Sequence, residues 1–116
     1  MDALSITATD ILQMVPICGG EAGIAAVIGC AQLARVDLHH GVSLWFDSDH
    51  TNPRRRPNMA AVCLLSTCSG QHSDLMPIPA DTVVLTGTDP GTGCPAHLRR
   101  DQYVALARAL IASACA

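Results

Sequence analysis

The clearest pattern of hydrophobic and polar positions in this sequence lies near its C-terminal end. Apolar side chains recur there at the spacing of one helical face, and charged side chains occupy the positions between them. The apolar set is Tyr103, Leu106, Ala107, Leu110 and Ile111, and the charged set is Arg99, Arg100, Asp101 and Arg108. This segment is therefore predicted to be an amphipathic helix with its charged residues facing outward.

Two helices are also predicted in the N-terminal part of the chain. The run from Thr7 to Asp10 places a hydroxyl at a cap position and a carboxylate three residues later, which is the pattern of a capping box. A short helix should start there and end before Pro16. A turn follows, and Glu21 suits the positive end of a second helix. From Ile24 onward, the second helix has apolar residues on one face and small residues on the other, so we expect it to be buried on most sides.

Three strands are predicted between these helices. Residues 41–46 and 81–87 are rich in β-forming side chains, and residues 60–68 are short and wholly apolar, which favours a central strand. The element order is then helix, helix, strand, strand, strand, helix. It predicts the α+β class, as a single small domain over residues 1–116 with about three strands and helices packed on one face of the sheet.

Composition narrows the functional classes. Hydrophobic residues make up 49% of the chain and charged residues 15%, so the chain can bury enough apolar surface to fold. Aromatic residues make up only 3%, which leaves no surface on which bases could stack. The formal net charge of -3 provides no basic face for a phosphate backbone. We therefore expect no nucleic-acid partner.

The apolar window over residues 15–34 is about as long as a membrane span, but Pro16, a glycine pair and Glu21 interrupt it. We interpret it as a buried core helix or as a helix in an oligomer interface, and we expect no membrane partner. The acidic N-terminus lacks the features of a secretory signal, and most of the six cysteines lie among apolar residues. A reducing cytoplasm is the expected location.

Cysteine and histidine spacings indicate one candidate metal site. Cys68 and His72 form one closely spaced pair, and Cys94 and His97 form another. Thiolate and imidazole ligands from two such pairs could complete a tetrahedral zinc site. The chain lacks the CxxC pair of the familiar zinc ribbons and fingers, so ordinary buried cysteines and loop histidines are the alternative interpretation.

The sequence offers two further kinds of candidate chemistry. The glycine-rich stretch 88–97 follows a predicted strand, as phosphate-binding loops do, but the lysine that such a loop needs is missing, so we interpret it as a strand-to-helix turn. A cysteine-dependent enzyme would pair Cys68 or Cys94 with a nearby histidine. No nucleophile loop is recognisable around either cysteine, and we assign no catalytic residue.

A longer pattern covers the C-terminal third of the chain. A strand that ends in an Asp-Pro pair runs through a glycine-proline turn into a helix with an aromatic residue, in the set Val83, Val84, Leu85, Thr88, Asp89, Pro90, Gly93, Pro95, Leu98, Tyr103 and Leu106. This pattern resembles a family of small actinobacterial proteins of unknown function that are often encoded beside helix-turn-helix regulators. The family's upstream Trp-Arg-Lys-Ser-Ser segment is absent here. The resemblance implies a bacterial, non-enzymatic partner of a regulator.

The apolar content is high for so small a chain, and few charges are available to cover its surface. We therefore expect a small cytoplasmic protein–protein interaction or regulatory module without enzymatic activity. Its partner would be another protein or a second copy, in an oligomer that buries part of residues 15–34. Two alternatives stay open, namely a zinc-stabilised small domain and a cysteine-dependent enzyme. No cofactor is expected apart from that zinc ion.

Overall fold

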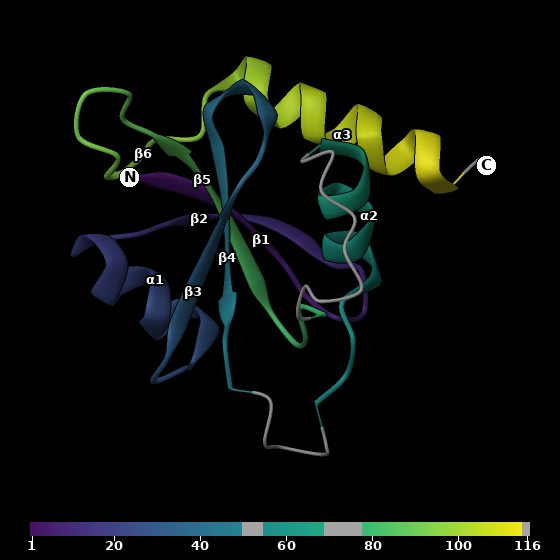
Figure 1. Cartoon of the computed structure of the whole chain (residues 1–116), viewed down its shortest axis with the longest axis horizontal. Coiled ribbons are helices and arrows are strands. Elements are labelled where there is room, and N and C mark those ends of the chain that lie inside the picture. Colours follow the sequence, from purple (N-terminus) through teal and green to yellow (C-terminus); the bar gives the residue numbers. More distant parts are fainter. Residues whose placement is uncertain (50–54, 69–77, 115–116) are drawn as a thin grey trace.

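The computed structural model describes residues 1–49, 55–68 and 78–114. Two strands followed by a helix occur three times in succession along the chain (Figure 1). The elements are β1 (Asp2–Ile6), β2 (Leu12–Pro16), α1 (Gly20–Ile28), β3 (Leu33–Asp37), the short 3-10 helix η1 (His39–Gly41), β4 (Val42–Asp47), α2 (Met59–Cys68), β5 (Val83–Thr88), β6 (Pro95–Ala96) and α3 (Arg100–Ala114).

The strands of the described residues form one antiparallel sheet. Its order is β2-β1-β5-β4-β3, and the short β6 pairs with the end of β5. The central strands β1, β5 and β4 therefore come from three different parts of the chain. The two outer strands are β2 and β3, and each has one edge that faces away from the sheet.

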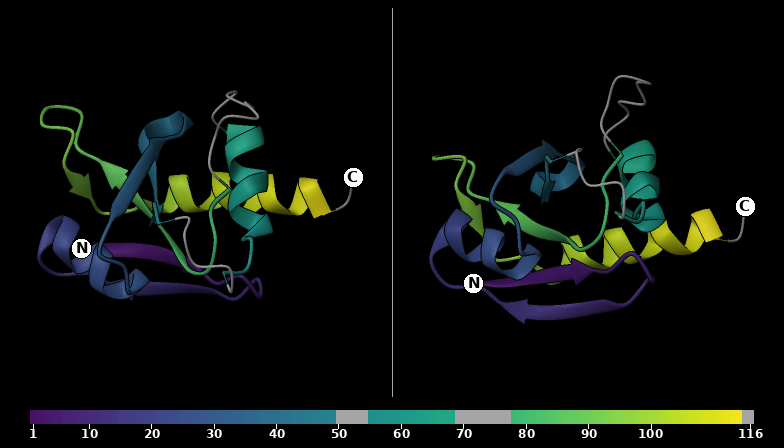
Figure 2. Two further views of the ribbon diagram at one scale, coloured as in Figure 1. Left: turned by 60° about the horizontal axis from the view of Figure 1, so that its bottom comes forward. Right: turned by 90° about the horizontal axis from the view of Figure 1, so that it is seen from below.

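The alternation of side chains along the central strands divides the core into two clusters. On one face, strand residues such as Leu4, Leu44 and Leu85 pack with Leu64 of α2 and Leu106 of α3. On the other face, the cluster consists of Ala3, Ile17, Ile24, Trp45 and Val84, where Ile24 comes from α1. In both views of Figure 2, α2 lies beside α3 and α1 lies apart from α2.

The predicted α+β class fits this structure, but two details of the prediction were wrong. Within the described residues, the sheet has six strands rather than about three. The helices also cover both faces of the sheet, because α1 belongs to one core cluster while α2 and α3 belong to the other. A strand buried on both faces needs a helix layer on each side, and β4 and β5 are buried along nearly their whole length.

Residues 2–16 form a β-hairpin where a capping box and a short helix were predicted. The Thr7 hydroxyl accepts a hydrogen bond from the Ile11 amide at 3.1 Å, and it lies 2.9 Å from the Thr9 hydroxyl. Asp10 adopts a left-handed backbone conformation with φ of 65°. The same polar residues that could cap a helix thus close a turn, and pairing of β1 with the distant β5 stabilises the extended form.

Residues 59–68 form helix α2, so the strand predicted at 60–68 was also wrong. The Asn58 side chain caps this helix, because its Oδ1 atom accepts a hydrogen bond from the Ala61 amide at 3.1 Å. The buried positions Ala61, Leu64 and Leu65 have helical spacing. Apart from Ser66 and Thr67 this run is apolar, so it shows little alternation between polar and apolar positions, and its sequence favoured the wrong element.

The apolar window 15–34 is divided among the end of β2, helix α1 and the start of β3. Gly29, with φ of 79°, ends α1 in a left-handed cap. None of the helices in the described part of the chain has the length and apolar character that a membrane span requires. The predicted strands at 41–46 and 81–87 are confirmed as β4 and β5, and the predicted C-terminal helix is confirmed as α3.

Candidate functional site

The structure places the predicted zinc ligands on different parts of the fold. Cys68 ends α2, whereas Cys94 lies exposed in the β5–β6 loop, on the opposite side of the molecule in Figures 1 and 2. His97 follows β6, and its Nδ1 atom accepts a hydrogen bond from the Asp2 amide at 3.0 Å. His72 lies outside the described residues. Within the described ranges, no group of three or more His, Cys, Asp and Glu side chains could hold a metal ion. The zinc site therefore stays a prediction.

The glycine-rich stretch 88–97 forms a β-hairpin rather than a strand-to-helix turn. Its loop amides bind within the loop, because Gly91 donates to the Asp89 carboxylate and Gly93 donates to the Asp89 carbonyl, both at 2.8 Å. The Arg35 guanidinium also donates to the Gly93 carbonyl at 2.7 Å. The Asp89 carboxylate thus occupies the place of an anion at the Gly91 amide, and the Asp89 carbonyl takes the Gly93 amide, so neither amide is available to a phosphate.

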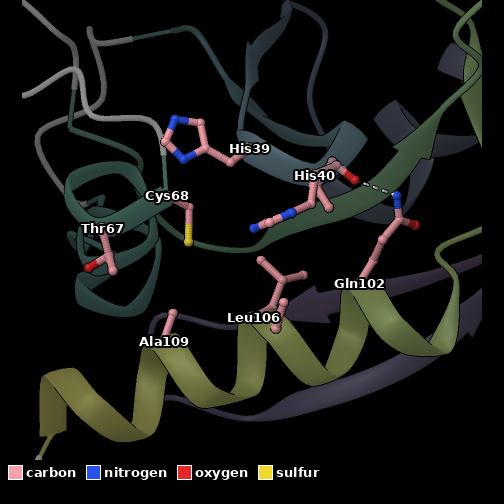
Figure 3. Close-up of a pocket in the computed structure, with 9 residues that line it drawn as sticks. His39, His40, Thr67, Cys68, Gln102, Leu106 and Ala109 are labelled. Carbon is pink, nitrogen blue, oxygen red and sulfur yellow. Dashed lines mark hydrogen bonds between the residues drawn. The ribbon is translucent and has the colours of Figure 1, made fainter.

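A pocket of about 210 Å³ opens between the β3–β4 turn, the end of α2 and α3 (Figure 3). Two adjacent histidines of η1 form one wall, Cys68 lies at the end of α2, and α3 forms the floor. The lining residues are His39, His40, Val42, Thr67, Cys68, Gln102, Ala105, Leu106 and Ala109. The sequence predicts a metal-binding role for Cys68 and indicates no role for Gln102.

Gln102 holds the pocket together. Its buried side chain donates hydrogen bonds to the carbonyls of His40 and Gly41 at 2.9 and 3.2 Å. Its Oε1 atom accepts a hydrogen bond from the Arg99 amide at 2.9 Å, which caps the start of α3. The left-handed conformation of His40, with φ of 65°, is fixed by this anchor. The sequence gives no sign of this role of Gln102, because the two carbonyls that it binds lie more than sixty residues away.

The chemistry of this pocket does not favour covalent catalysis. Burial raises the pKa of the Cys68 thiol above its usual range, so the thiol is protonated at neutral pH. A catalytic cysteine needs the opposite, a thiolate stabilised by a nearby positive charge or a helix N-terminus. Cys68 instead lies at the C-terminal end of α2, where the helix dipole disfavours a thiolate. The pocket is a mostly apolar recess without an activated nucleophile.

The outer strand β3 carries charged residues on the face of the sheet that α1 covers, opposite to the face with the pocket. The Arg35 guanidinium lies 5.5 Å from the centre of the Trp45 ring and pairs with Asp37 at 3.1 Å. Asp37 in turn accepts a hydrogen bond from the Ser43 hydroxyl at 3.1 Å, and the Trp45 indole donates to Thr86 at 2.9 Å. Charged side chains on an outer strand discourage pairing with another chain.

The other outer strand, β2, differs in having no charged residue in its sequence Leu-Gln-Met-Val-Pro. Leu12 and Met14 alternate with Gln13, so both extend from the same face of the sheet, and they are 40% and 46% exposed. Ile11, at the end of the hairpin, is 58% exposed. Apolar side chains therefore extend along an outer strand that no charge protects.

The hydrogen-bonding pattern of the hairpin fixes which backbone groups of β2 face outward. Ile17 pairs with Met1 through two hydrogen bonds of 2.7 and 3.0 Å, and Thr7 donates to Ile11 at 3.0 Å. Hydrogen-bonded and non-hydrogen-bonded pairs alternate along an antiparallel ladder. The amides and carbonyls of Leu12 and Met14 therefore point away from β1, where the described strands offer them no ladder partner. Pro16 shares this outward direction and has no N–H group to expose.

The sequence did not indicate this edge, because the residues of β2 were assigned to a helix. A comparison of the chain with protein-family models, curated proteins and solved structures found no match. The resemblance of the C-terminal third to small proteins encoded beside regulators therefore stays a prediction.

Proposed function

We propose that this protein is a small, non-enzymatic protein–protein interaction module of the cytoplasm that binds an extended polypeptide segment along the outer edge of β2, which no strand of the described residues covers. The observation that carries the proposal is the outward row of backbone donors and acceptors at Leu12 and Met14, with exposed apolar side chains at the same two residues. A bound strand would satisfy these backbone groups and cover these side chains, as in other cases of strand addition to a sheet.

The contrast between the two outer strands supports this choice of site. On β3, Arg35 and Asp37 form an ion pair beside the free edge, so an incoming strand would have to accommodate both charges. On β2, the only polar side chain is that of Gln13, which an incoming strand can pair without burying a charge. The chain thus carries one edge that resists pairing and one that permits it.

The proposal is tested with a displayed library of extended peptides selected against the purified protein. Met14→Pro removes one outward N–H and leaves the bonds to β1 intact, in the way that Pro16 already does in the same strand. Met14→Ala keeps that N–H and shortens the side chain. Since one peptide carbonyl loses its donor, we expect Met14→Pro to weaken selected peptides by about tenfold and Met14→Ala to weaken them less.

Circular dichroism and the fluorescence of the single tryptophan should match in all three proteins, which shows that the fold is kept. Amide hydrogen exchange then reports whether Leu12 and Met14 become protected when a peptide binds. The proposal would be abandoned if selected peptides bound Met14→Pro as tightly as the wild type, or if they protected other amides and left these two unchanged.

A further inference from the structure

We infer that the segment bound along β2 is acidic and carries apolar side chains at alternate positions, which pack against the exposed flank of α3. The inference rests on the proposed function and names the chemical class of its ligand. Two observations carry it. Exposed apolar side chains of β2 and α3 lie on the same side of the sheet, and two arginines of α3 beside them form no ion pair within the described residues.

Helix α3 turns one flank toward the hairpin of β1 and β2. In both views of Figure 2, α3 lies between α2 and this hairpin. The flank of α3 on the α2 side holds Ala105 and Ala109, which line the pocket of Figure 3. The helical period places Tyr103 and Leu110 on the other side of the buried Leu106. This second flank therefore faces the hairpin.

The exposed side chains of β2 point to the same face of the sheet. Leu12 and Met14 lie opposite β1 residues that belong to the core cluster of α2 and α3, and residues opposite each other in a ladder share a face. Together they form an apolar surface with the second flank of α3, and contiguous exposed apolar surface is typical of binding sites. We call it the α3–β2 surface, and it consists of Leu12, Met14, Tyr103, Leu110 and Ile111.

A strand added to β2 would place every second side chain on this surface. The residues of the added strand beside Leu12 and Met14 point to the α3 face, and the residue beside Gln13 points to the other face. The ligand therefore needs apolar side chains at alternate positions and accepts polar ones between them. A helix laid on the surface would cover the same apolar side chains but leave the outward backbone groups of β2 without ladder partners.

Two arginines give this surface a positive charge. Arg100 and Arg108 are exposed, and each lies three residues before an exposed apolar side chain of the α3–β2 surface, so it is a neighbour of that side chain on the helix. The acidic residue of α3, Asp101, already pairs with Arg99 at 3.1 Å. An acidic ligand complements the two remaining charges, and a basic one is repelled by them.

The same charges disfavour a second copy as the occupant. In a symmetric pair of β2 strands, the α3 helices of both copies lie on the same face of the joined sheet. Each copy would then bring its own Arg100 and Arg108 to the shared surface, where like charges oppose association. An acidic segment of another protein meets no such opposition.

Three synthetic peptides test the ligand class. The reference peptide alternates valine with threonine and has two glutamates at each end. The second peptide has lysines in place of the glutamates. The third has the composition of the reference, but its valines are adjacent, so that they no longer share one face of a strand. Fluorescence polarisation of the labelled peptides measures the Kd, and we expect the second and third peptides to bind roughly tenfold more weakly than the reference.

Two variants of the protein test the contribution of α3. Tyr103→Ala should weaken the reference peptide by about tenfold, because it removes a large apolar side chain from the α3–β2 surface. Val27→Ala is the matched control, since Val27 is 38% exposed, close to the 37% of Tyr103, but lies on α1 at the other face of the sheet. It should leave the Kd unchanged, and circular dichroism should show the same fold in both variants.

Arg100→Gln tests the charge of the surface. We expect it to weaken the reference peptide by about threefold and to leave the lysine peptide no weaker, because only the glutamates lose an attractive partner. The difference between the wild type and Arg100→Gln should shrink as salt is added.

The inference would be overturned if the reference peptide bound no better than the other two, or if Tyr103→Ala and Val27→Ala had the same Kd for it. A dimer in light scattering that Met14→Pro abolishes would also overturn it, since a second copy would then occupy the edge. In each of these cases, library peptides that Met14→Pro still weakens would leave the proposed function standing. If Met14→Pro has no effect on them, both proposals fail.

Discussion

Replacing Asn58 with aspartate separates two roles of one buried side chain. Asn58 is fully buried, and its Oδ1 atom caps α2 through the Ala61 amide. Its Nδ2 atom donates to two carbonyls, that of Ile6 at 3.0 Å and that of Asp81 at 2.8 Å. The side chain therefore joins the end of β1, the approach to β5 and the start of α2.

The two roles of Asn58 predict very different changes in the free energy of unfolding for Asn58→Asp. As helix caps alone, asparagine and aspartate are nearly equivalent, so capping predicts almost no change in the free energy of unfolding. Loss of both Nδ2 donors removes one buried hydrogen bond, to Ile6, and one partly buried hydrogen bond, to Asp81, at about 1–3 kcal/mol each. The total of roughly 2–6 kcal/mol is a large part of the 5–15 kcal/mol that typically stabilises a domain. A carboxylate directed at two carbonyl oxygens adds repulsion to that loss.

Urea unfolding, followed by circular dichroism and by the fluorescence of Trp45, measures the difference. Asn58→Ser is the matched control, because its hydroxyl keeps a cap acceptor and introduces no charge. We expect Asn58→Ser to lose about 2–3 kcal/mol and Asn58→Asp to lose more. If Asn58→Asp is too unstable to fold, the thermal midpoint of Asn58→Ser still reports the loss of the donors.

The pH dependence gives a second readout. Burial beside carbonyl oxygens should raise the pKa of the introduced carboxyl in the folded state above its unfolded value. The folded chain then binds the proton more tightly, so the part of the penalty that comes from the charge is full at neutral pH and disappears as the pH falls below the unfolded pKa, while the cost of the lost donors remains. An Asn58→Asp protein within 1 kcal/mol of the wild type at neutral pH would refute the reasoning, because capping alone would then account for this residue.

Two further predictions concern the β5–β6 hairpin and the thiols. In Gly87→Ala the new Cβ would lie 2.3 Å from the His97 carbonyl oxygen, so we expect the free energy of unfolding in urea to fall by more than about 2 kcal/mol. In the control Gly91→Ala the nearest atom lies 3.4 Å from the new Cβ, so this free energy should change by less than about 0.5 kcal/mol. Equal losses in the two variants would contradict this account. Burial raises the pKa of two thiols, so alkylation at mild pH, followed by mass spectrometry, should modify them more slowly than the exposed thiols, at a rate that increases as the pH rises. The slow thiols are Cys30 and Cys68 and the fast ones Cys18 and Cys94, and rapid modification of Cys68 would argue for a catalytic thiol after all.

The candidate site could not be predicted from the sequence. The edge of β2 depends on the choice between hairpin and helix for residues 2–16, and that choice is made by the pairing of β1 with β5, about eighty positions further along the chain. The pocket beside Cys68 depends on Gln102, whose hydrogen bonds reach back to His40 and Gly41. Local sequence patterns cannot reveal contacts of this kind, because the contacts join residues that lie far apart in the sequence.

The sequence by itself determined the elements whose own period or composition is decisive. The stripe around Leu106 specified α3, although α3 buries Gln102 and leaves Tyr103 and Ile111 37% and 64% exposed. The β-forming runs specified β4 and β5, since alternating side chains of this kind pack well on a buried sheet.

Only the tertiary structure decided the remaining elements. The apolar run 60–68 has no period, and it is helical because Asn58, anchored to Ile6 and Asp81, caps it. Thr7 and Asp10 satisfy backbone groups as well in a turn as in a helix cap, so the burial of β1 between β2 and β5 selects the hairpin. Where a segment has similar local preferences for helix and strand, the free energy gained by burying a central strand determines its conformation.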